Sequence, residues 1–248
     1  MNHDIYNTDV LVGLGALGDE TIDVIFTSPP YNLKNSTGGG MKNGKGGKWE
    51  GNALELGAYD EYDDNIPQDQ YISWMRKVIT ECFRVLKPTG ALFFNHKFRV
   101  QGGLIQDHTE MLEGFNVRQV IIWQRSGGIN FNKGYFLPTY EVIYLMPKTA
   151  RGKDSFQLVP KANAHGDVWT IHQERNNPHP APWPLELPRR VLSSSLPAGR
   201  PVALDPFAGS GGLAVAAEEL GWDSISIEQS SQYCDMIKGR LGELGVSV

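Results

Sequence analysis

In this chain of 248 residues, residues 201–212, PVALDPFAGSGG, give the clearest indication of the fold. Its first part, Val202–Leu204, is a short apolar run typical of a buried strand, and the segment Leu213–Leu220 that follows predicts a helix. The glycines between them let the backbone pass close to a ligand, and the free amides at a helix start favour a polar group. The stretch therefore predicts a ligand site at the carboxyl end of the strand.

A second strand, Ser224–Ile227, ends in Glu228. The sequence separation between Asp205 and Glu228 is close to that at which an acid binds ribose hydroxyls in nucleotide sites. The loop lacks the third glycine of a dinucleotide-binding loop, and Asp205 would repel a pyrophosphate. S-adenosylmethionine (SAM) suits the loop better, because carboxylates attract its amino group and sulfonium. We therefore expect SAM as the cofactor. The expected contacts are Asp205, Pro206, Phe207, Ala208, Gly209, Ser210, Gly211 and Glu228.

Elsewhere the chain alternates between strand and helix patterns. Ile22–Thr27 predicts a buried strand, and the apolar spacing over Gln70–Leu86 predicts an amphipathic helix. The further expected elements are a strand at Ala91–Phe94, a helix at Leu104–Glu113, an antiparallel pair of strands at Val117–Trp123 and Tyr140–Met146, and helices at Leu185–Ser194 and Gln232–Leu244. This alternation predicts an α/β fold with a mostly parallel sheet and helices on both faces.

The first strand leads into Ser28-Pro29-Pro30-Tyr31. Two prolines fix the backbone and leave carbonyls without competing amide donors, so those carbonyls can face a substrate amine. The amine of a nucleobase is a poor nucleophile, which must be held in line with the methyl donor and polarised by hydrogen bonds. We interpret Ser28 and the Pro29 carbonyl as the groups that do so, with Tyr31 able to stack on a base.

The tetrad at 28–31 and the loop FAGSG at 207–211 resemble the two hallmark motifs of the DNA amino-methyltransferases, D/N/S-P-P-Y/F/W and F-x-G-x-G. The tetrad comes first, as in the β group of that family, which implies one permuted catalytic domain over residues 1–248. Asn177–Pro180 resembles the family segment leading to the methionine end of SAM, which adds His179 and Pro180 as expected cofactor contacts.

The resemblance also implies a Rossmann-like sheet of seven strands, mostly parallel, with one antiparallel strand. The target-recognition region would lie between the catalytic and cofactor halves. This position matches residues 147–180, a proline-rich stretch with little periodicity that we interpret as an inserted or bridging segment.

Double-stranded DNA is the implied partner, with the target base flipped out of the duplex. The net charge of -5 argues against nonspecific coating of nucleic acid, but it allows a local basic patch. Residues 33–52 are rich in glycine and lysine, and we interpret them as a mobile loop that orders on DNA. The expected DNA-binding residues are Lys34, Lys42, Lys45, Lys48, Arg125 and Lys133, and further candidates are Trp49, Asn130, Trp169 and Arg175.

Serine at the first tetrad position is typical of cytosine-N4 enzymes, whereas aspartate is typical of adenine-N6 enzymes. Ser28 therefore favours cytosine and leaves adenine-N6 as the alternative. Methylation at cytosine C5 requires a cysteine nucleophile. Both Cys82 and Cys234 fall within expected helices, so we expect neither to act as that nucleophile.

An RNA or protein methyltransferase is a rival, although its glycine loop usually precedes the tetrad. A non-catalytic DNA-binding protein is another rival, and detectable SAM binding would argue against it. The histidines at 165, 172 and 179 lack the spacing of metal ligands, so no metal is expected.

The remaining features concern the environment of the protein. No apolar run approaches the roughly 20 residues that a membrane-spanning helix requires, and the first ten residues lack the pattern of a secretory signal. The two cysteines have no spacing partner, which favours a reducing cytoplasm. We expect a cytoplasmic protein without a membrane partner. The family resemblance permits a homodimer.

Overall fold

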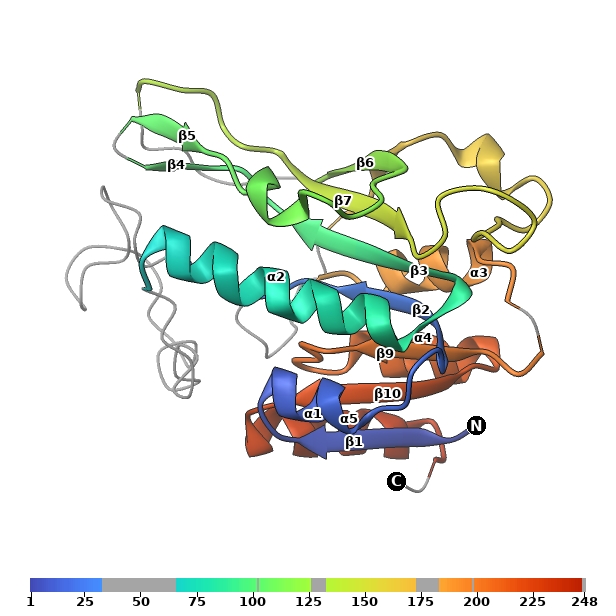
Figure 1. The fold of residues 1–248 in the computed structure, drawn as a ribbon. Helices are drawn as coiled ribbons and strands as arrows, with labels where there is room; N and C mark the ends of the chain where they lie inside the picture. Colours follow the sequence, from blue (N-terminus) through green and yellow to red (C-terminus); the bar gives the residue numbers. More distant parts are fainter. Residues whose placement is uncertain (33–65, 102, 126–132, 173–182, 198, 247–248) are drawn as a thin grey trace.

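The computed structural model describes residues 1–32, 66–101, 103–125, 133–172, 183–197 and 199–246 (Figure 1). The strands are β1 (His3–Asn7), β2 (Ile22–Thr27), β3 (Leu86–His96), β4 (Arg99–Gln101), β5 (Leu104–Gln106), β6 (Gln119–Gln124), β7 (Tyr140–Pro147), β8 (Val168–Thr170), β9 (Val202–Asp205) and β10 (Asp223–Glu228). The helices are α1 (Val10–Ala16), α2 (Gln68–Val85), α3 (Glu186–Ser194), α4 (Gly212–Leu220) and α5 (Ser231–Glu243), with short 3-10 turns at η3 (Thr109–Leu112) and η4 (Ala162–His165).

The main sheet has eight strands in the order β1-β10-β9-β2-β3-β7-β6-β8. Each neighbouring pair is parallel except where β7 runs antiparallel to both β3 and β6. The mostly parallel sheet with one antiparallel strand is thus confirmed, and the expected count of seven strands is corrected to eight. Residues 147–180, expected to be irregular, supply the edge strand β8, which pairs with β6.

The centre of the sheet determines where a ligand can bind. β2 and β9 are neighbours, but the chain continues from β2 to β3 on one side and from β9 to β10 on the other. A crevice forms at the carboxyl ends of parallel strands wherever the order reverses in this way. The loops that follow β2 and β9 therefore begin next to each other.

Alternate residues of the central strands pack into two cores. Leu92 and Phe94 of β3 face the cluster formed with α1 and α2, whereas Ala91 and Phe93 face the cluster formed with α3 and α4. Figure 1 shows these two pairs of helices on opposite faces of the sheet. A strand buried on both faces favours apolar residues on both, which explains why β2 is mostly apolar, with Asp23 and Thr27 as its polar residues.

Most predicted elements are confirmed to within a few residues, but one prediction was wrong. The helix expected over Leu104–Glu113 is instead strand β5, paired with β4 as a hairpin, followed by the single turn η3. Leu104 and Ile105 are exposed whereas Met111 and Leu112 are buried, so the apolar residues of this segment do not form one buried stripe. None of the helices in the described part of the chain has the length and apolarity needed to cross a bilayer.

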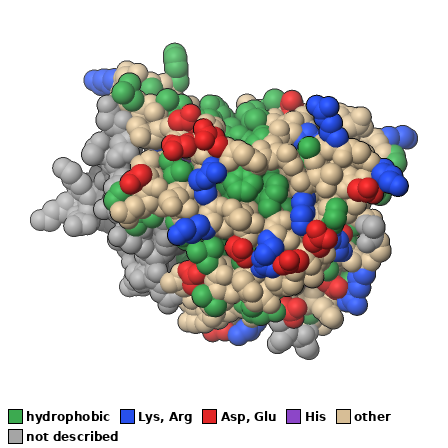
Figure 2. All heavy atoms as spheres, viewed as in Figure 1, with side chains coloured by type: hydrophobic (Ala, Val, Ile, Leu, Met, Phe, Trp, Pro, Cys, Tyr) green, Lys and Arg blue, Asp and Glu red, His purple; other side chains and the backbone are tan. Residues whose placement is uncertain are grey.

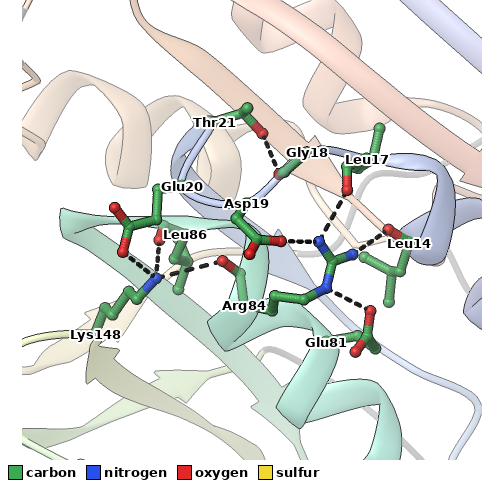
Figure 3. A network of polar contacts seen from close by, with 10 residues as sticks. All are labelled: Leu14, Leu17, Gly18, Asp19, Glu20, Thr21, Glu81, Arg84, Leu86 and Lys148. Atoms are coloured by element: carbon green, nitrogen blue, oxygen red, sulfur yellow. Dashed lines mark hydrogen bonds and ion pairs between the residues drawn. The ribbon is translucent and has the colours of Figure 1, made fainter.

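The amino-terminal ends of β2 and β3 are tied together by Arg84, near the end of α2 (Figure 3). Its guanidinium donates hydrogen bonds to the carbonyls of Leu14 (2.7 Å) and Leu17 (2.9 Å). It also forms ion pairs with Asp19 and Glu81. One side chain thus joins α1, the turn before β2, and α2.

Lys148, directly after β7, joins the same edge of the sheet (Figure 3). Its ammonium donates to the Leu86 carbonyl at 2.7 Å and forms an ion pair with Glu20 at 3.1 Å. On the face shown in Figure 2, basic and acidic side chains are interspersed. The visible charges of that face therefore do not form one basic surface.

Candidate active site

The ends of β2 and β9 are joined by a hydrogen bond between buried side chains. The Thr27 hydroxyl donates to Asp205 Oδ1 at 2.7 Å, and the two strands pair in parallel with Ile25 opposite Leu204. The residue after Thr27 is Ser28, and the residue after Asp205 is Pro206. The structure therefore brings the tetrad and the glycine loop together at one edge of the sheet.

On the loop side, Asp205 is fully buried. Its Oδ1 also accepts from the Phe207 amide at 3.0 Å, whereas its Oδ2 has no hydrogen-bond partner among the described residues. Burial, together with the charge of Glu228, raises the pKa of Asp205 to about 7, although the bonds from Thr27 and Phe207 lower it. An unfilled buried carboxylate oxygen is suited to a cationic group of a ligand.

The glycine loop is held against the end of β10. Gly209 donates its amide to Glu228 Oε2 at 2.8 Å, and the Ser230 amide donates to Glu228 Oε1 at 2.9 Å. Gly211 has φ +77°, and a Cβ added there would lie 2.7 Å from Ile237 of α5. The loop can therefore turn sharply into α4 only because that position is glycine.

Two tryptophans flank this loop. The ring of Trp74, on α2, contacts the ring of Phe207 with centroids 5.8 Å apart. The ring of Trp183 lies so close to Gly212 that a Cβ there would come within 3.1 Å of it. Of the other predicted loop residues, Pro206, Ala208 and Ser210 are buried.

On the tetrad side, four side chains form a closed network. Ser28 Oγ lies 2.6 Å from the Tyr31 hydroxyl, which donates to Glu141 Oε2 at 3.1 Å. The Asn95 amide nitrogen lies 2.9 Å from the same Glu141 oxygen, 2.8 Å from the Tyr31 oxygen and 3.2 Å from Ser28 Oγ. The first and last residues of the tetrad are thus oriented by two residues outside it.

The sheet topology explains why this network forms. Asn95 lies near the carboxyl end of β3, and Glu141 is the second residue of β7. Because β7 is antiparallel, its first residues reach the edge at which the parallel strands end. Arg125, directly after β6, pairs with Glu141 Oε1 at 3.0 Å.

Side chains of α2 and β3 hold the Pro30 peptide in place. The Tyr71 hydroxyl of α2 donates to the Pro30 carbonyl at 2.8 Å and lies 2.9 Å from His96 Nε2. The His96 ring contacts the Tyr31 ring at a centroid distance of 4.7 Å. Burial, followed by the neighbouring His108, holds the pKa of His96 well below its usual value, so the ring is neutral near pH 7.

The predicted DNA contacts have different positions. Arg125 lies within the polar network rather than on an open surface, Lys133 is exposed, and Trp169 is buried with its indole NH bonded to the Gly166 carbonyl. Lys34, Lys42, Lys45, Lys48, Trp49, Asn130, Arg175, His179 and Pro180 lie outside the described residues, as does the loop 33–52. Within the described part of the chain, no cluster of His, Cys, Asp or Glu could hold a metal ion.

The sequence interpretation missed Asn95 and Glu141. Both are polar residues at the ends of otherwise apolar strands, Asn95 just after Ala91–Phe94 and Glu141 at the second position of Tyr140–Met146. That pattern could have identified them as site residues. The predicted antiparallel strand Tyr140–Met146 begins at the edge of the sheet where the parallel strands end, so Glu141 would lie at that edge. The tetrad was instead interpreted without partners.

Comparison with known proteins gives consistent matches. A family model described as DNA methylase, of the N6/N4 type, matches residues 22–239. The Type II methyltransferase M.BglII of Bacillus subtilis is 27% identical over 273 residues, covering 94% of this chain and 67% of that protein.

Solved structures share the fold. PvuII DNA methyltransferase (cytosine-N4-specific) matches with a TM-score of 0.75 at 18% identity, over 97% of this chain and 86% of that one. A Thermus thermophilus protein complexed with S-adenosyl-L-methionine matches with a TM-score of 0.65 at 23% identity, over 97% of this chain and 93% of that one. Because the family model spans most of the sequence as well, the chain belongs to the N6/N4 DNA methylase family.

Proposed function

We propose that this protein is a site-specific DNA methyltransferase that uses SAM to methylate the exocyclic amine of an extruded base, with cytosine N4 as the target. The hydrogen bond between Thr27 and Asp205 carries the proposal. It joins the end of β2, which leads into the tetrad, to the end of β9, which leads into the glycine loop. A base at the tetrad and a ligand at the loop would therefore lie next to each other.

The residues of the loop side fit SAM. The unfilled Asp205 Oδ2 suits the ammonium of its methionine part, and the Glu228 carboxylate suits its ribose hydroxyls. The glycines leave room for close approach of the adenosine. SAM, when bound, supplies a methyl group activated by its sulfonium. His179 and Pro180 remain predicted contacts.

The residues of the tetrad side would hold the base amine. Ser28 Oγ and the Pro29 carbonyl are oxygen acceptors suited to the amine hydrogens, which would increase the electron density on nitrogen. The Tyr71 bond to the Pro30 carbonyl fixes the neighbouring peptide. The chain thus supplies positioning and polarisation rather than a covalent intermediate.

Cytosine is favoured over adenine by the residue type at position 28. The resemblance links serine at this position to cytosine-N4 enzymes, and the PvuII protein that shares the fold is itself cytosine-N4-specific. Adenine-N6 methylation remains the alternative, because the family contains both types.

Duplex DNA would approach the edge of the sheet where the parallel strands end. The tetrad is partly buried there, so a base within a duplex would not reach it without being flipped out. Lys133 is exposed, and we propose it as a contact to the phosphate backbone. The mixed charges of the face in Figure 2 suit DNA less well.

Incubation of the purified chain with unmethylated DNA and isotope-labelled SAM tests the proposal directly. Nucleoside mass spectrometry should then find label in N4-methylcytosine. Label in N6-methyladenine alone would show that the target base is adenine and not cytosine. Absence of label from DNA despite measurable SAM binding would overturn the proposed activity.

A further inference from the structure

We propose that Glu141 is a positioning residue: it sets the direction of the hydrogen bonds through Tyr31 and Ser28, and thereby makes Ser28 Oγ an acceptor for the amine of the target base. The inference rests on the proposed function, since it concerns the same amine. It assigns a role to a side chain outside both sequence motifs.

Glu141 is held in one orientation by its neighbours. It is 5% exposed, and its two oxygens have different partners. Arg125 Nη1 pairs with Oε1 at 3.0 Å, while Oε2 receives the Tyr31 hydroxyl and the Asn95 amide. The ion pair therefore leaves Oε2 directed at the tetrad.

The direction of the hydrogen bonds from Ser28 through Tyr31 to Glu141 follows from which atoms can donate and which can accept. The Tyr31 hydroxyl donates to Glu141 Oε2, because the carboxylate that pairs with Arg125 is a hydrogen-bond acceptor. The Tyr31 oxygen can then only accept from Ser28, 2.6 Å away, which places the serine proton in that bond. The lone pairs of Ser28 Oγ are left for other donors.

Asn95 does not remove this capacity. Its amide nitrogen has two hydrogens for three nearby oxygens, and the contact to Ser28 Oγ, at 3.2 Å, is the longest of the three. A hydroxyl oxygen has two lone pairs, so Ser28 Oγ retains at least one for a substrate N–H. An accepting oxygen draws a proton of the amine away from nitrogen, which favours attack on the methyl group.

Tyr31 remains a donor over the working pH range. Burial, followed by the charge of Glu141, raises the pKa of its phenol well above the usual value, so the hydroxyl keeps its proton. The chain from Ser28 to Glu141 is therefore complete near neutral pH.

Glu141→Gln should reverse the donor and acceptor roles in the hydrogen bonds from Ser28 to residue 141, while every side chain of the network stays in place. Arg125 requires an acceptor, so the glutamine oxygen would face Arg125 and its NH₂ would face Tyr31. Tyr31 would then donate to Ser28, and the serine proton would point towards the base amine, which is itself a donor. Tyr31→Phe, in contrast, cuts the chain and leaves the Ser28 hydroxyl free to rotate.

The experiment is a double-variant cycle with single-turnover methylation of unmethylated DNA as the readout. We expect Glu141→Gln to slow methyl transfer by at least about 100-fold and Tyr31→Phe by about 10-fold. The double variant Tyr31→Phe/Glu141→Gln should be no slower than Tyr31→Phe, because the reversed direction can no longer reach Ser28. Glu113→Gln, an exposed acid, is the matched control.

SAM affinity and melting temperature, measured on each variant without DNA, separate positioning from structural damage. Positioning predicts SAM dissociation constants within about twofold of wild type for all variants. Three results would overturn the proposal: a Glu141→Gln rate within about threefold of wild type, a double variant slowed by the product of the single effects, or a matching loss of SAM binding. If the wild-type chain methylates no DNA, the proposed function fails instead.

Discussion

The two ends of the central strands carry polar clusters of different kinds. At the amino end, Arg84 and Lys148 each donate to two backbone carbonyls, and Asp19, an acid paired with Arg84, is 73% exposed (Figure 3). At the carboxyl end, buried or partly buried side chains bond to one another, with Asn95 and Glu141 at the centre.

The difference indicates a division between stability and chemistry. Bonds to backbone carbonyls fix segments of chain relative to one another. Bonds among buried side chains fix the orientation of individual oxygens. Among the described residues, Asp205 Oδ2 and Asn95 Oδ1 at the carboxyl end, and Asp23 Oδ1 at the amino end, are buried without a hydrogen-bond partner. Changes at the carboxyl end should therefore alter rate or ligand affinity, and changes at the amino end should alter the free energy of unfolding.

The largest expected effect is that of Ser28→Ala. Removing the acceptor for the base amine should lower the single-turnover methylation rate by about 10²–10³-fold, or about 3–4 kcal/mol. SAM affinity should stay within about twofold, because the cofactor loop is untouched. Rapid-quench kinetics with labelled SAM measures the rate and equilibrium titration the affinity, and Ser193→Ala, exposed on α3, is the control. A normal rate would remove Ser28 from the mechanism.

Asp205→Asn should come next. It keeps a side chain of the same shape but loses the charge that would pair with the ammonium of SAM. We expect SAM affinity to fall by about 10–100-fold, in line with the roughly 1.5–3 kcal/mol of a hydrogen bond to a charged group. Isothermal titration calorimetry measures the change, with the exposed Asp235→Asn as control. Unchanged affinity would place the ammonium elsewhere.

Arg84→Met tests the amino end. It removes the bonds to Leu14 and Leu17 and should lower the free energy of unfolding by about 2 kcal/mol. The ion pair with the exposed Asp19 should contribute little of this. Urea denaturation gives the stability, and SAM titration should show wild-type affinity. A variant with normal stability but weakened SAM binding would contradict the division.

The smallest effect concerns pH. Because the pKa of Asp205 is raised to about 7, the carboxyl is largely protonated at pH 6 and must lose that proton to pair with the ammonium of SAM. Affinity should therefore fall as pH falls, by about tenfold from pH 8 to pH 6, or about 1.4 kcal/mol. Asp205→Asn should abolish this dependence. A wild-type profile that is flat over this range would exclude Asp205 as the titrating contact.

The fold was largely predictable because its signals are local. The strands Ile22–Thr27 and Val202–Leu204 are apolar runs bounded by turn residues, and the helix at Gln70–Leu86 has a regular apolar spacing. The edge strand β8 and the hairpin β4–β5 are only three residues per strand, too short to show a period. Pairing with neighbours, rather than local preference, decides their structure.

The candidate site was predictable only in the parts that form contiguous motifs. Ser28–Tyr31 and Asp205–Gly211 can be identified because adjacent residues share one task. Asn95 and Glu141 lie 46 residues apart and meet only through the register of two antiparallel strands. Arg125 was predicted as a DNA contact, and its ion pair with Glu141 depends on the pairing of β6 with β7, which places Trp123 opposite Glu141.

The placement of two indole rings against the glycine loop has a practical consequence. Trp74 contacts Phe207 within the loop, and Trp183 lies against Gly212 at its end. A molecule that settles there would change the surroundings of both rings, so their intrinsic fluorescence offers a label-free optical signal. Substituting Trp74 or Trp183 singly by phenylalanine would show which of the two emits it.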